Sequence, residues 1–227
     1  MTDLDILYED DDMIVCHKPA GVATQTKRLG KQDMESLLKN YRAGKKEPPY
    51  IGIIHRLDQP VEGVMVFAKS QKSAAKLSKQ VRERTIGKHY YAVVKKTETC
   101  SLEEQGILRD YILSDERGNI SQIVTKDTPK AKEAKLEYRV IGQTEELLCV
   151  DILLHTGRHH QIRLQFSNAG APILGDAKYG NEKNTQLALC AYRLELQHPG
   201  TKENMDFCVL PKGSLFAGFL DNTGNMT

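Results

Sequence analysis

The chain has 227 residues, of which 40% are hydrophobic and 27% charged, and its formal net charge is +2. This length and composition allow a full hydrophobic core, and the lack of long apolar runs predicts no transmembrane span. The acidic N-terminus MTDLDILYEDDD lacks the apolar segment of a secretory signal, so we expect a cytoplasmic protein. Its five cysteines are scattered, which favours buried free thiols over disulfides or a zinc ribbon.

The N-terminal third of the chain predicts short strands followed by helices. Two strands flank the acidic turn 9–12, and the breaker Pro-Ala-Gly at 19–21 ends the second strand. Asp33 is a candidate cap for a short helix. Residues 61–68 predict a buried strand, and Ser70 caps the helix that follows it. The apolar face of that second helix comprises Ala74, Leu77 and Val81.

Most of the remaining chain predicts strands joined by short turns. KHYYAVVKK is a strand by β-propensity. The further strand candidates are 107–113, 119–125, 133–141, 147–154, LALCAYRLEL and DFCVL. Residues 156–169 predict a helix that Gly170 closes. Because strands outnumber helices and mostly lack crossover helices, we expect one mixed α/β (α+β) domain, residues 1–227, around a largely antiparallel sheet.

Basic residues are concentrated between Lys69 and Lys96, where nine Lys and Arg residues stand against a single acidic residue, Glu83. Charge alone favours a solvated helix face for this stretch. The alternative is a surface that binds phosphates, because such a surface also needs Lys and Arg with few carboxylates to cancel them.

Two clusters of charged side chains lie beside apolar segments. His55, Arg56 and Asp58 precede the buried strand predicted at 61–68, where a charged group belongs either to a solvated turn or to a site. Arg158 and Arg163 lie at the start of the last predicted helix, whose macrodipole already presents positive potential there. We therefore expect these two arginines to face a carboxylate or a ligand phosphate.

Five segments of the chain occur in the order of a known protein family. GIIHRLDQPVEGVMVFAKS contains a His-Arg-Leu-Asp tetrad, YEDDDMIVCHKPAGV a Lys-Pro-Ala-Gly turn, and KHYYAVV a Lys-x-Tyr-x-Ala strand. HTGRHHQIRLQF is followed by GAPILGDAKYG, and LCAYRLELQHP ends in His-Pro. Together they resemble the RluA-type pseudouridine synthases over about residues 6–212. The resemblance implies the pseudouridine synthase fold, a bent sheet with flanking helices.

The resemblance implies catalytic roles for three residues. Asp58 matches the aspartate whose carboxylate is the nucleophile in converting uridine to pseudouridine, by attack on either the sugar or the base. Burial disfavours the charged form of such a carboxylate, so it needs an opposite charge, and Arg163 matches the arginine in that position. Tyr90 matches the tyrosine that contacts the target base. We expect it to stack rather than remove a proton, because a phenol with a pKa of about 10 is a poor base at neutral pH.

The resemblance also implies contacts with RNA. Arg56 matches an arginine that enters the RNA and fills the space left by the flipped uridine, whose C1′ and C5 cannot be reached while it is stacked. Gly63 would let the loop pass close to a strand. The residues expected to bind RNA are His55, Arg56, Lys69, Lys76, Lys79, Lys88, Arg158 and His160.

The chain departs from the family pattern at two places. Val61-Glu62 stands where the family has Thr-Ser before Gly63, which removes two hydroxyls from the catalytic loop and adds a carboxylate. The hydrogen bonding of that loop and its substrate contacts are therefore in question. Gln165 replaces a frequent His, which we interpret as a packing or specificity variation. We expect no small RNA-binding domain before residue 1, so that the catalytic domain alone would hold the RNA.

These inferences predict an RNA pseudouridine synthase, an isomerase that acts on a uridine of ribosomal RNA or tRNA. We expect a monomer that binds structured RNA, contacts no membrane, and needs no metal, nucleotide or other cofactor. The alternative is a non-enzymatic RNA-binding protein of the same fold, which the Val61-Glu62 departure motivates. A metal-dependent hydrolase that uses His55, Asp58 and the histidines at 159 and 160 is disfavoured, because adjacent residues on a helix project about 100° apart.

Overall fold

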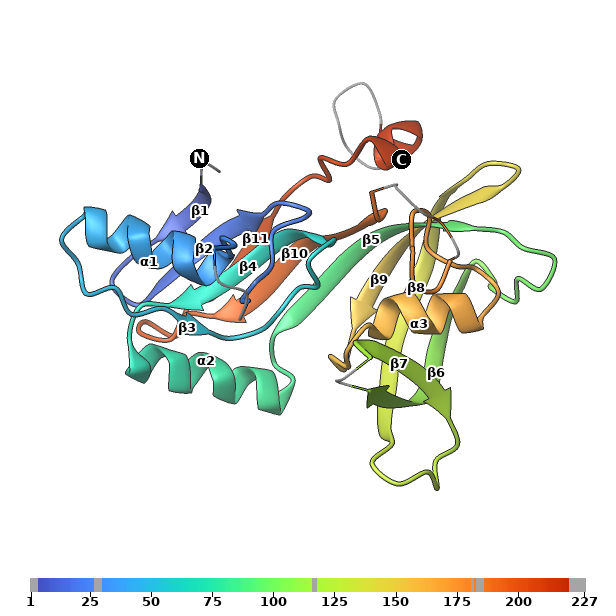
Figure 1. Ribbon diagram of the computed structural model, residues 1–227, viewed down its shortest axis with the longest axis horizontal. Coiled ribbons are helices and arrows are strands. Elements are labelled where there is room, and N and C mark those ends of the chain that lie inside the picture. Colours follow the sequence, from blue (N-terminus) through green and yellow to red (C-terminus); the bar gives the residue numbers. More distant parts are fainter. Residues whose placement is uncertain (1–3, 27–29, 116–117, 181, 183–185, 221–227) are drawn as a thin grey trace. The chain divides into compact units, whose positions relative to one another are not determined.

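The computed structural model describes residues 4–26, 30–115, 118–180, 182 and 186–220. This part of the chain contains eleven strands, three α-helices and one short 3-10 helix (Figure 1). The chain separates into two compact units, residues 1–87 with 191–209 and residues 88–190 with 210–227, which we call the first and the second unit. The predicted mixed α/β class with antiparallel strands is confirmed, and the single domain stays a prediction.

The first unit is built on antiparallel strand pairs. Its strands are β1 (Asp5–Glu9), β2 (Met13–Lys18), β3 (Gly52–Ile53), β4 (Glu62–Ala68), β11 (Asn204–Cys208) and, from residue 191 on, β10 (Leu189–Gln197). β2 pairs with β1 and β4, β3 pairs with β4, and β11 pairs with β10. Every residue of β2 and β4 is buried. Strands covered on both faces read as continuous apolar runs, which is why both were predictable from the sequence.

Two helices of the first unit begin where the sequence predicts. Asp33 caps α1 (Met34–Gly44) through a capping box, in which its side chain accepts a hydrogen bond from Ser36 N–H. The Ser70 hydroxyl caps α2 (Gln71–Glu83). Leu77 of α2 is fully buried in a cluster with Val64 and Val66 of β4. Burying this apolar stripe holds α2 against the strands and leaves its basic residues on the outer side.

The second unit contains the longest strands. In order of pairing they are β5 (Gly87–Lys95, from residue 88 on), β9 (Leu147–Leu154), β8 (Lys132–Gln143), β6 (Gln105–Asp115) and β7 (Ile120–Val124), each antiparallel to the next. α3 (Gln161–Asn168) lies against β6 and β7, and its Leu164 packs on Ile112 of β6 and on Ala134 of β8. A 3-10 helix (Ser214–Phe219) also belongs to this unit, and the sequence analysis did not predict it.

α3 is shorter than predicted, because residues 156–160 are not helical. His160 takes a left-handed conformation with φ 56° and forms the N-cap position. The side chain of Gln161 accepts hydrogen bonds from Arg158 N–H and from the Thr156 hydroxyl, which supports this irregular entry. Gly170, with φ +71°, follows the helix end as predicted, and a Cβ there would collide with the Thr99 carbonyl.

The five cysteines form no disulfide, and their burial differs. Cys16, Cys149 and Cys190 are buried, Cys100 is half-buried and Cys208 is exposed. Burial raises the pKa of the Cys16 and Cys149 thiols to about 12, so these two are unreactive. No helix within the described residues is long and apolar enough to cross a membrane.

Candidate active site

Asp58 lies in the first unit, in the loop between β3 and β4. Its side chain is half-buried. Val61 N–H donates a hydrogen bond of 3.0 Å to the Asp58 carbonyl, which closes a tight turn that contains Pro60. Leu57 is buried. The buried side chain of Leu57 therefore anchors the turn from which the Asp58 carboxylate projects.

Hydrogen bonds fasten this loop on both sides of Asp58. The Thr24 hydroxyl donates to the Leu57 carbonyl over 2.9 Å and accepts from Leu57 N–H over 3.2 Å. Gly21 N–H donates to the Gln59 carbonyl over 2.8 Å, and the Gln59 side chain donates back to the Gly21 carbonyl over 2.9 Å. The sequence left the hydrogen bonding of this loop in question, and the segment from Gly21 to Thr24 provides it.

Lys18 supports the same loop from a buried position at the end of β2. Its ammonium donates hydrogen bonds to the carbonyls of Pro19, Val22 and Gln59, at 3.0, 2.6 and 3.2 Å. A lysine ammonium has three N–H groups, so these carbonyls use its full donor capacity. Burial lowers the pKa of Lys18 to about 8, although the negative charges of Asp58 and Glu62 oppose that shift.

Gly63 follows the loop at the start of β4 and has φ +136°. A Cβ at this position would collide with the backbone of Ala191 in β10. Only glycine tolerates both this conformation and this close approach. Gly63 was predicted to let the loop pass close to a strand; in the structure it lies within β4, and the close approach is between β4 and β10.

His55 and Arg56 occupy the loop before Asp58. Val66 N–H donates to His55 Nε2 over 3.2 Å. This nitrogen therefore acts as an acceptor, which leaves the proton of the neutral ring on Nδ1. Arg56 is exposed, and its guanidinium lies 3.3 Å from the side-chain oxygen of Gln25. Because this hydrogen bond is long and exposed to solvent, breaking it costs little free energy if Arg56 contacts RNA instead.

The second unit carries Tyr90 and Arg163. Tyr90 is a buried residue of β5 and pairs with Ile152 of β9. Arg163, on α3, donates two parallel hydrogen bonds to Asp176, from Nε over 2.8 Å and from a terminal nitrogen over 2.6 Å. Burial would raise the pKa of Asp176, but Arg163 outweighs it and holds that pKa below its usual value. The guanidinium is thus fixed in orientation, whereas its role beside Asp58 stays a prediction.

Two histidines stand at the start of α3. The rings of His159 and His160 stack with their centroids 3.7 Å apart, and His160 Nδ1 lies 2.8 Å from the Tyr179 hydroxyl. Burial, assisted by the charge of Arg163, lowers the pKa of His160 to about 3, so this imidazole is neutral at physiological pH. Within the described residues, no group of three or more His, Cys, Asp and Glu side chains is placed to bind a metal ion.

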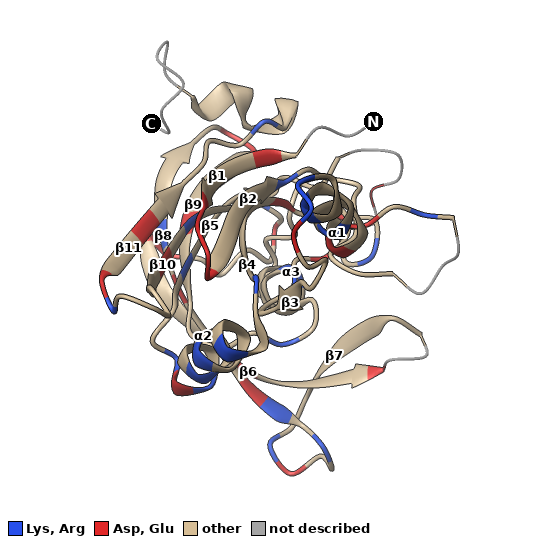
Figure 2. Ribbon diagram, turned by 90° about the vertical axis from the view of Figure 1, so that its left-hand side faces the viewer, with Lys and Arg blue, Asp and Glu red and all other residues tan. Residues whose placement is uncertain are grey.

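Figure 2 marks the Lys and Arg residues in blue, several of them on α2. The basic residues expected to bind RNA differ in the contacts that they make. Lys69 is buried and pairs with Glu9 and Glu47 at 2.9 and 3.1 Å. Lys76 donates to the Pro199 carbonyl over 2.7 Å. Lys79, in contrast, has a side chain that is 65% exposed, with Glu83 at 3.7 Å. The outer side of α2 is therefore available to a ligand at Lys79, while Lys69 and Lys76 stabilise the fold.

Two further basic residues lie in the second unit. Burial lowers the pKa of Lys88, and its ammonium lies close to Gly157. Arg158 donates from Nε to the Glu133 carbonyl over 2.9 Å. Arg158 was expected to face a carboxylate or a ligand phosphate. In the structure its Nε binds a backbone carbonyl instead. The RNA contacts of Lys88, Arg158 and His160 stay predictions.

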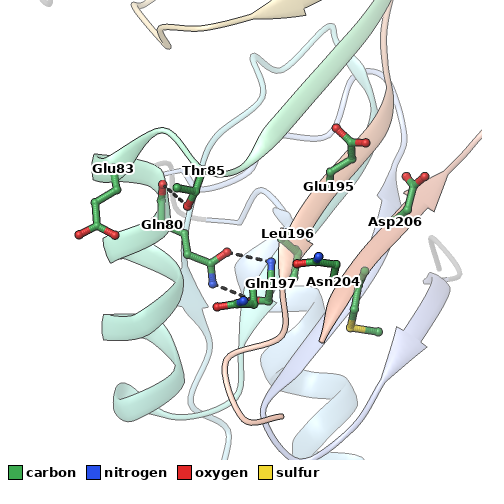
Figure 3. Close-up of a pocket in the computed structure, with 9 residues that line it drawn as sticks. Gln80, Glu83, Thr85, Glu195, Leu196, Gln197, Asn204 and Asp206 are labelled. Carbon is green, nitrogen blue, oxygen red and sulfur yellow. Dashed lines mark hydrogen bonds between the residues drawn. The ribbon is translucent and has the colours of Figure 1, made fainter. Parts of the chain in front are cut away.

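A pocket of about 490 Å³ opens in the first unit between α2, β10 and β11 (Figure 3). The Gln80 side chain donates a hydrogen bond to the Gln197 carbonyl over 2.7 Å and accepts one from Gln197 N–H over 2.9 Å. Arg193 forms ion pairs with the wall residues Glu195 and Asp206. Since its walls contain none of the predicted site residues, this pocket is not the candidate active site.

Comparison with known proteins assigns the class. Residues 12–168 match the family described as RNA pseudouridylate synthase. The chain belongs to the RNA pseudouridylate synthase family. In structure it resembles "Human RNA Pseudouridylate Synthase Domain Containing 4", with a TM-score of 0.74 and 24% identity, covering 92% of this chain and 89% of that one. This likeness confirms the predicted fold.

Two bacterial relatives define the similarity more closely. The chain is 34% identical over 179 residues to ribosomal large subunit pseudouridine synthase C of Rickettsia bellii, covering 78% of this chain and 57% of that protein. It is 32% identical over 222 residues to ribosomal large subunit pseudouridine synthase D of Vibrio cholerae, covering 90% and 66%. The chain thus spans somewhat more than half the length of these relatives.

Sequence reasoning missed several residues that support the site. Lys18, Thr24 and Gln59 were given no role, although a lysine at the end of a fully buried strand is an unusual feature. Asp176 lies in the quoted segment GAPILGDAKYG, but its pairing with Arg163 could not be read from the spacing. In each case the missing information was a contact between different segments of the chain.

Proposed function

We propose that this protein is an RNA pseudouridine synthase that isomerises a uridine of ribosomal RNA or tRNA in the cytoplasm, as a monomer. Family membership and the names of the bacterial relatives support this activity. The observation that carries the proposal is the loop around Asp58, where hydrogen bonds fix the residues immediately before and after the half-buried carboxylate. A nucleophile held in one orientation lowers the entropic cost of the reaction.

In the proposed reaction the Asp58 carboxylate attacks the flipped-out nucleotide. The bond between N1 of uracil and C1′ of ribose breaks, the base turns, and a bond between C5 and C1′ forms. C5 loses its proton and N1 gains one, so no electrons enter or leave and no redox cofactor is needed. Tyr90 stacks on the base.

RNA is held by phosphate contacts along α2 and by the residues that flank the loop. Lys79 offers an exposed ammonium, and Arg56 lies next to the nucleophile. Arg56 fills the space that the flipped uridine leaves. Lys69 and Lys76 are left out of this surface, because each already binds partners within the first unit.

The experiment that tests the function is pseudouridine mapping of total RNA from cells with and without this gene. Loss of one or a few sites in ribosomal RNA or tRNA is expected, and it would also identify the substrate. Purified protein should restore those sites on unmodified RNA in the presence of excess chelator. If no site depends on the gene, the alternative of a non-enzymatic RNA-binding protein is favoured.

A further inference from the structure

Tyr179 lies in a turn after α3, in the second unit, and contacts both members of the buried pair of Arg163 and Asp176. Its main-chain N–H donates a hydrogen bond of 3.1 Å to Asp176 Oδ1. The same oxygen accepts a hydrogen bond of 2.6 Å from a terminal nitrogen of Arg163. The guanidinium carbon of Arg163 lies over the Tyr179 ring, 5.4 Å from its centroid. At this distance the face of an aromatic ring attracts a cation.

The two hydrogen bonds from Arg163 to Asp176 leave the guanidinium one freedom of movement. They hold one edge of this planar group against the carboxylate. The group can still tilt about the line of these two bonds, because neither bond acts on its faces. The Tyr179 ring lies on one face and limits the tilt in that direction. The orientation of Arg163 therefore depends on where the Tyr179 ring is held.

The Tyr179 hydroxyl ties the ring to two different segments. It accepts a hydrogen bond from Ser121 N–H of β7 over 2.9 Å, and it lies 2.8 Å from His160 Nδ1. Since the oxygen already accepts from Ser121, we assign the hydroxyl as the donor to Nδ1 of the neutral imidazole. Burial raises the pKa of the Tyr179 hydroxyl, so it keeps its proton for this bond at physiological pH.

Tyr179 also follows one face of α3. His160, Arg163 and Ser167 are three and four residues apart, a spacing that places side chains on the same face of a helix. The His160 and Tyr179 rings meet edge to face, with their centroids 5.5 Å apart. At the other end of α3, the Ser167 hydroxyl donates to the Tyr179 carbonyl over 2.9 Å. Tyr179 is thus fastened on both sides of the position where it meets Arg163.

We propose that Tyr179 is a positioning residue for Arg163: its ring fixes the plane of the guanidinium that Asp176 holds by one edge, and its hydroxyl keeps the ring in place. This inference rests on the proposed function, because the family resemblance is what gives Arg163 a catalytic role. A displacement of about 1 Å in a catalytic group can cost about 100-fold in rate. Loss of Tyr179 should therefore slow the reaction step more than it weakens RNA binding.

The first test compares reaction rates of wild type, Tyr179→Phe and Tyr179→Leu. The substrate is RNA with C5-tritiated uridine from cells without this gene. Phenylalanine keeps the ring but loses the hydroxyl, whereas leucine loses the ring as well. At saturating protein, the single-turnover rate should fall roughly three- to tenfold in Tyr179→Phe and roughly 30- to 100-fold in Tyr179→Leu. The protein concentration that gives half of the maximal rate should change less than about twofold.

The matched control is Tyr138→Phe, on β8 of the same unit. The Tyr138 hydroxyl also accepts a hydrogen bond from a main-chain N–H, that of Glu103, over 3.1 Å. Its ring packs edge to face on Phe166, with the centroids 5.8 Å apart. Tyr138→Phe should lower Tm about as much as Tyr179→Phe but change the reaction rate less than about twofold. Equal losses of rate in the two variants would mean that lost stability is the cause, which overturns the positioning role.

The second test observes Arg163 directly and needs no activity. The Nε–H signal of Arg163, assigned from its side-chain correlations, is followed by NMR during hydrogen exchange. In wild type the bond to Asp176 protects this proton. Exchange should be at least roughly fivefold faster in Tyr179→Phe and unchanged in Tyr138→Phe. If Tyr179→Leu does not fold, Tyr179→Phe alone decides both tests.

The outcomes separate the two proposals. If Tyr179→Phe leaves either the exchange rate at Arg163 or the reaction rate unchanged, Tyr179 is not a positioning residue for Arg163. If wild type forms no pseudouridine in any cellular RNA, the proposed function fails. In that case hydrogen exchange still decides whether the Tyr179 hydroxyl keeps the Arg163 guanidinium in place.

Discussion

The buried ammonium of Lys18 donates a hydrogen bond of 3.2 Å to the carbonyl of Gln59, the residue that follows Asp58. Lys18→Met keeps most of the side-chain volume but leaves three carbonyls without their donor. We expect the free energy of unfolding to fall by about 2–4 kcal/mol in urea denaturation. Lys39→Met is the control, because that side chain is 44% exposed and its helix-surface pair contributes under about 0.5 kcal/mol. Equal effects of the two variants would contradict a supporting role for Lys18.

The pair of Arg163 and Asp176 should contribute much more to stability than an exposed pair of the same geometry. Asp176→Asn leaves a buried guanidinium without its counter-ion, which should cost about 3–5 kcal/mol. Arg193 and Asp206 form a matched pair with similar hydrogen bonds, but their side chains are 35% and 47% exposed. Asp206→Asn should therefore cost less than about 1 kcal/mol. Thermal unfolding of both variants gives the comparison, and similar shifts in Tm would refute it.

His160 should make the protein sensitive to acid. The pKa of His160 is lowered from 6.5 to about 3, so between these values the unfolded chain binds a proton that the folded chain does not. Stability from this group is present above pH 6.5 and is lost as the pH falls towards 3. Between pH 7 and pH 4.5 the loss should be roughly 2–3 kcal/mol.

The comparison that isolates this effect is His160→Gln, which keeps an acceptor for the Tyr179 hydroxyl but does not titrate. Urea denaturation at the two pH values should show a smaller loss of stability in the variant than in wild type. If both proteins lose the same free energy of unfolding, His160 is not the group responsible.

RNA binding should depend on the exposed side of α2. Lys79→Glu should weaken binding to every RNA tested and lower the slope of log K against log salt by up to roughly one unit. The control, Lys39→Glu, reverses an exposed lysine on α1. If Lys79→Glu leaves the salt slope unchanged, α2 is a solvated helix face, as charge alone favours, and does not bind phosphates.

Local signals predicted most of the fold. The caps Asp33 and Ser70, the buried run of β4 and the turn residues around it depend on neighbours in the sequence. The start of α3 could not be predicted in this way, because Gln161 hydrogen-bonds into residues 156–158 and His160 adopts a left-handed conformation. Periodicity carries no information about such local hydrogen bonds between side chain and backbone.

The candidate site was predictable only in part, and for a related reason. Asp58 stands out because a charged residue beside a buried strand needs an explanation. The groups that hold its loop, Lys18 and Thr24, come from more than 30 residues away along the chain. Equally, charge counting could not show that Lys69 is neutralised by Glu9 and Glu47, because those contacts form only in the folded protein.

The most direct measurement is tritium release from RNA that carries C5-labelled uridine, with wild type and folded Asp58→Asn assayed beside an RNA-binding titration. Asp58→Asn keeps the volume of the side chain but removes the nucleophilic charge. We predict that wild type releases tritium, that the variant releases none, and that its RNA affinity is equal or slightly higher, since an anion has been removed from a surface that attracts phosphate. Turnover by Asp58→Asn near the wild-type rate would contradict the assignment of Asp58 as the nucleophile.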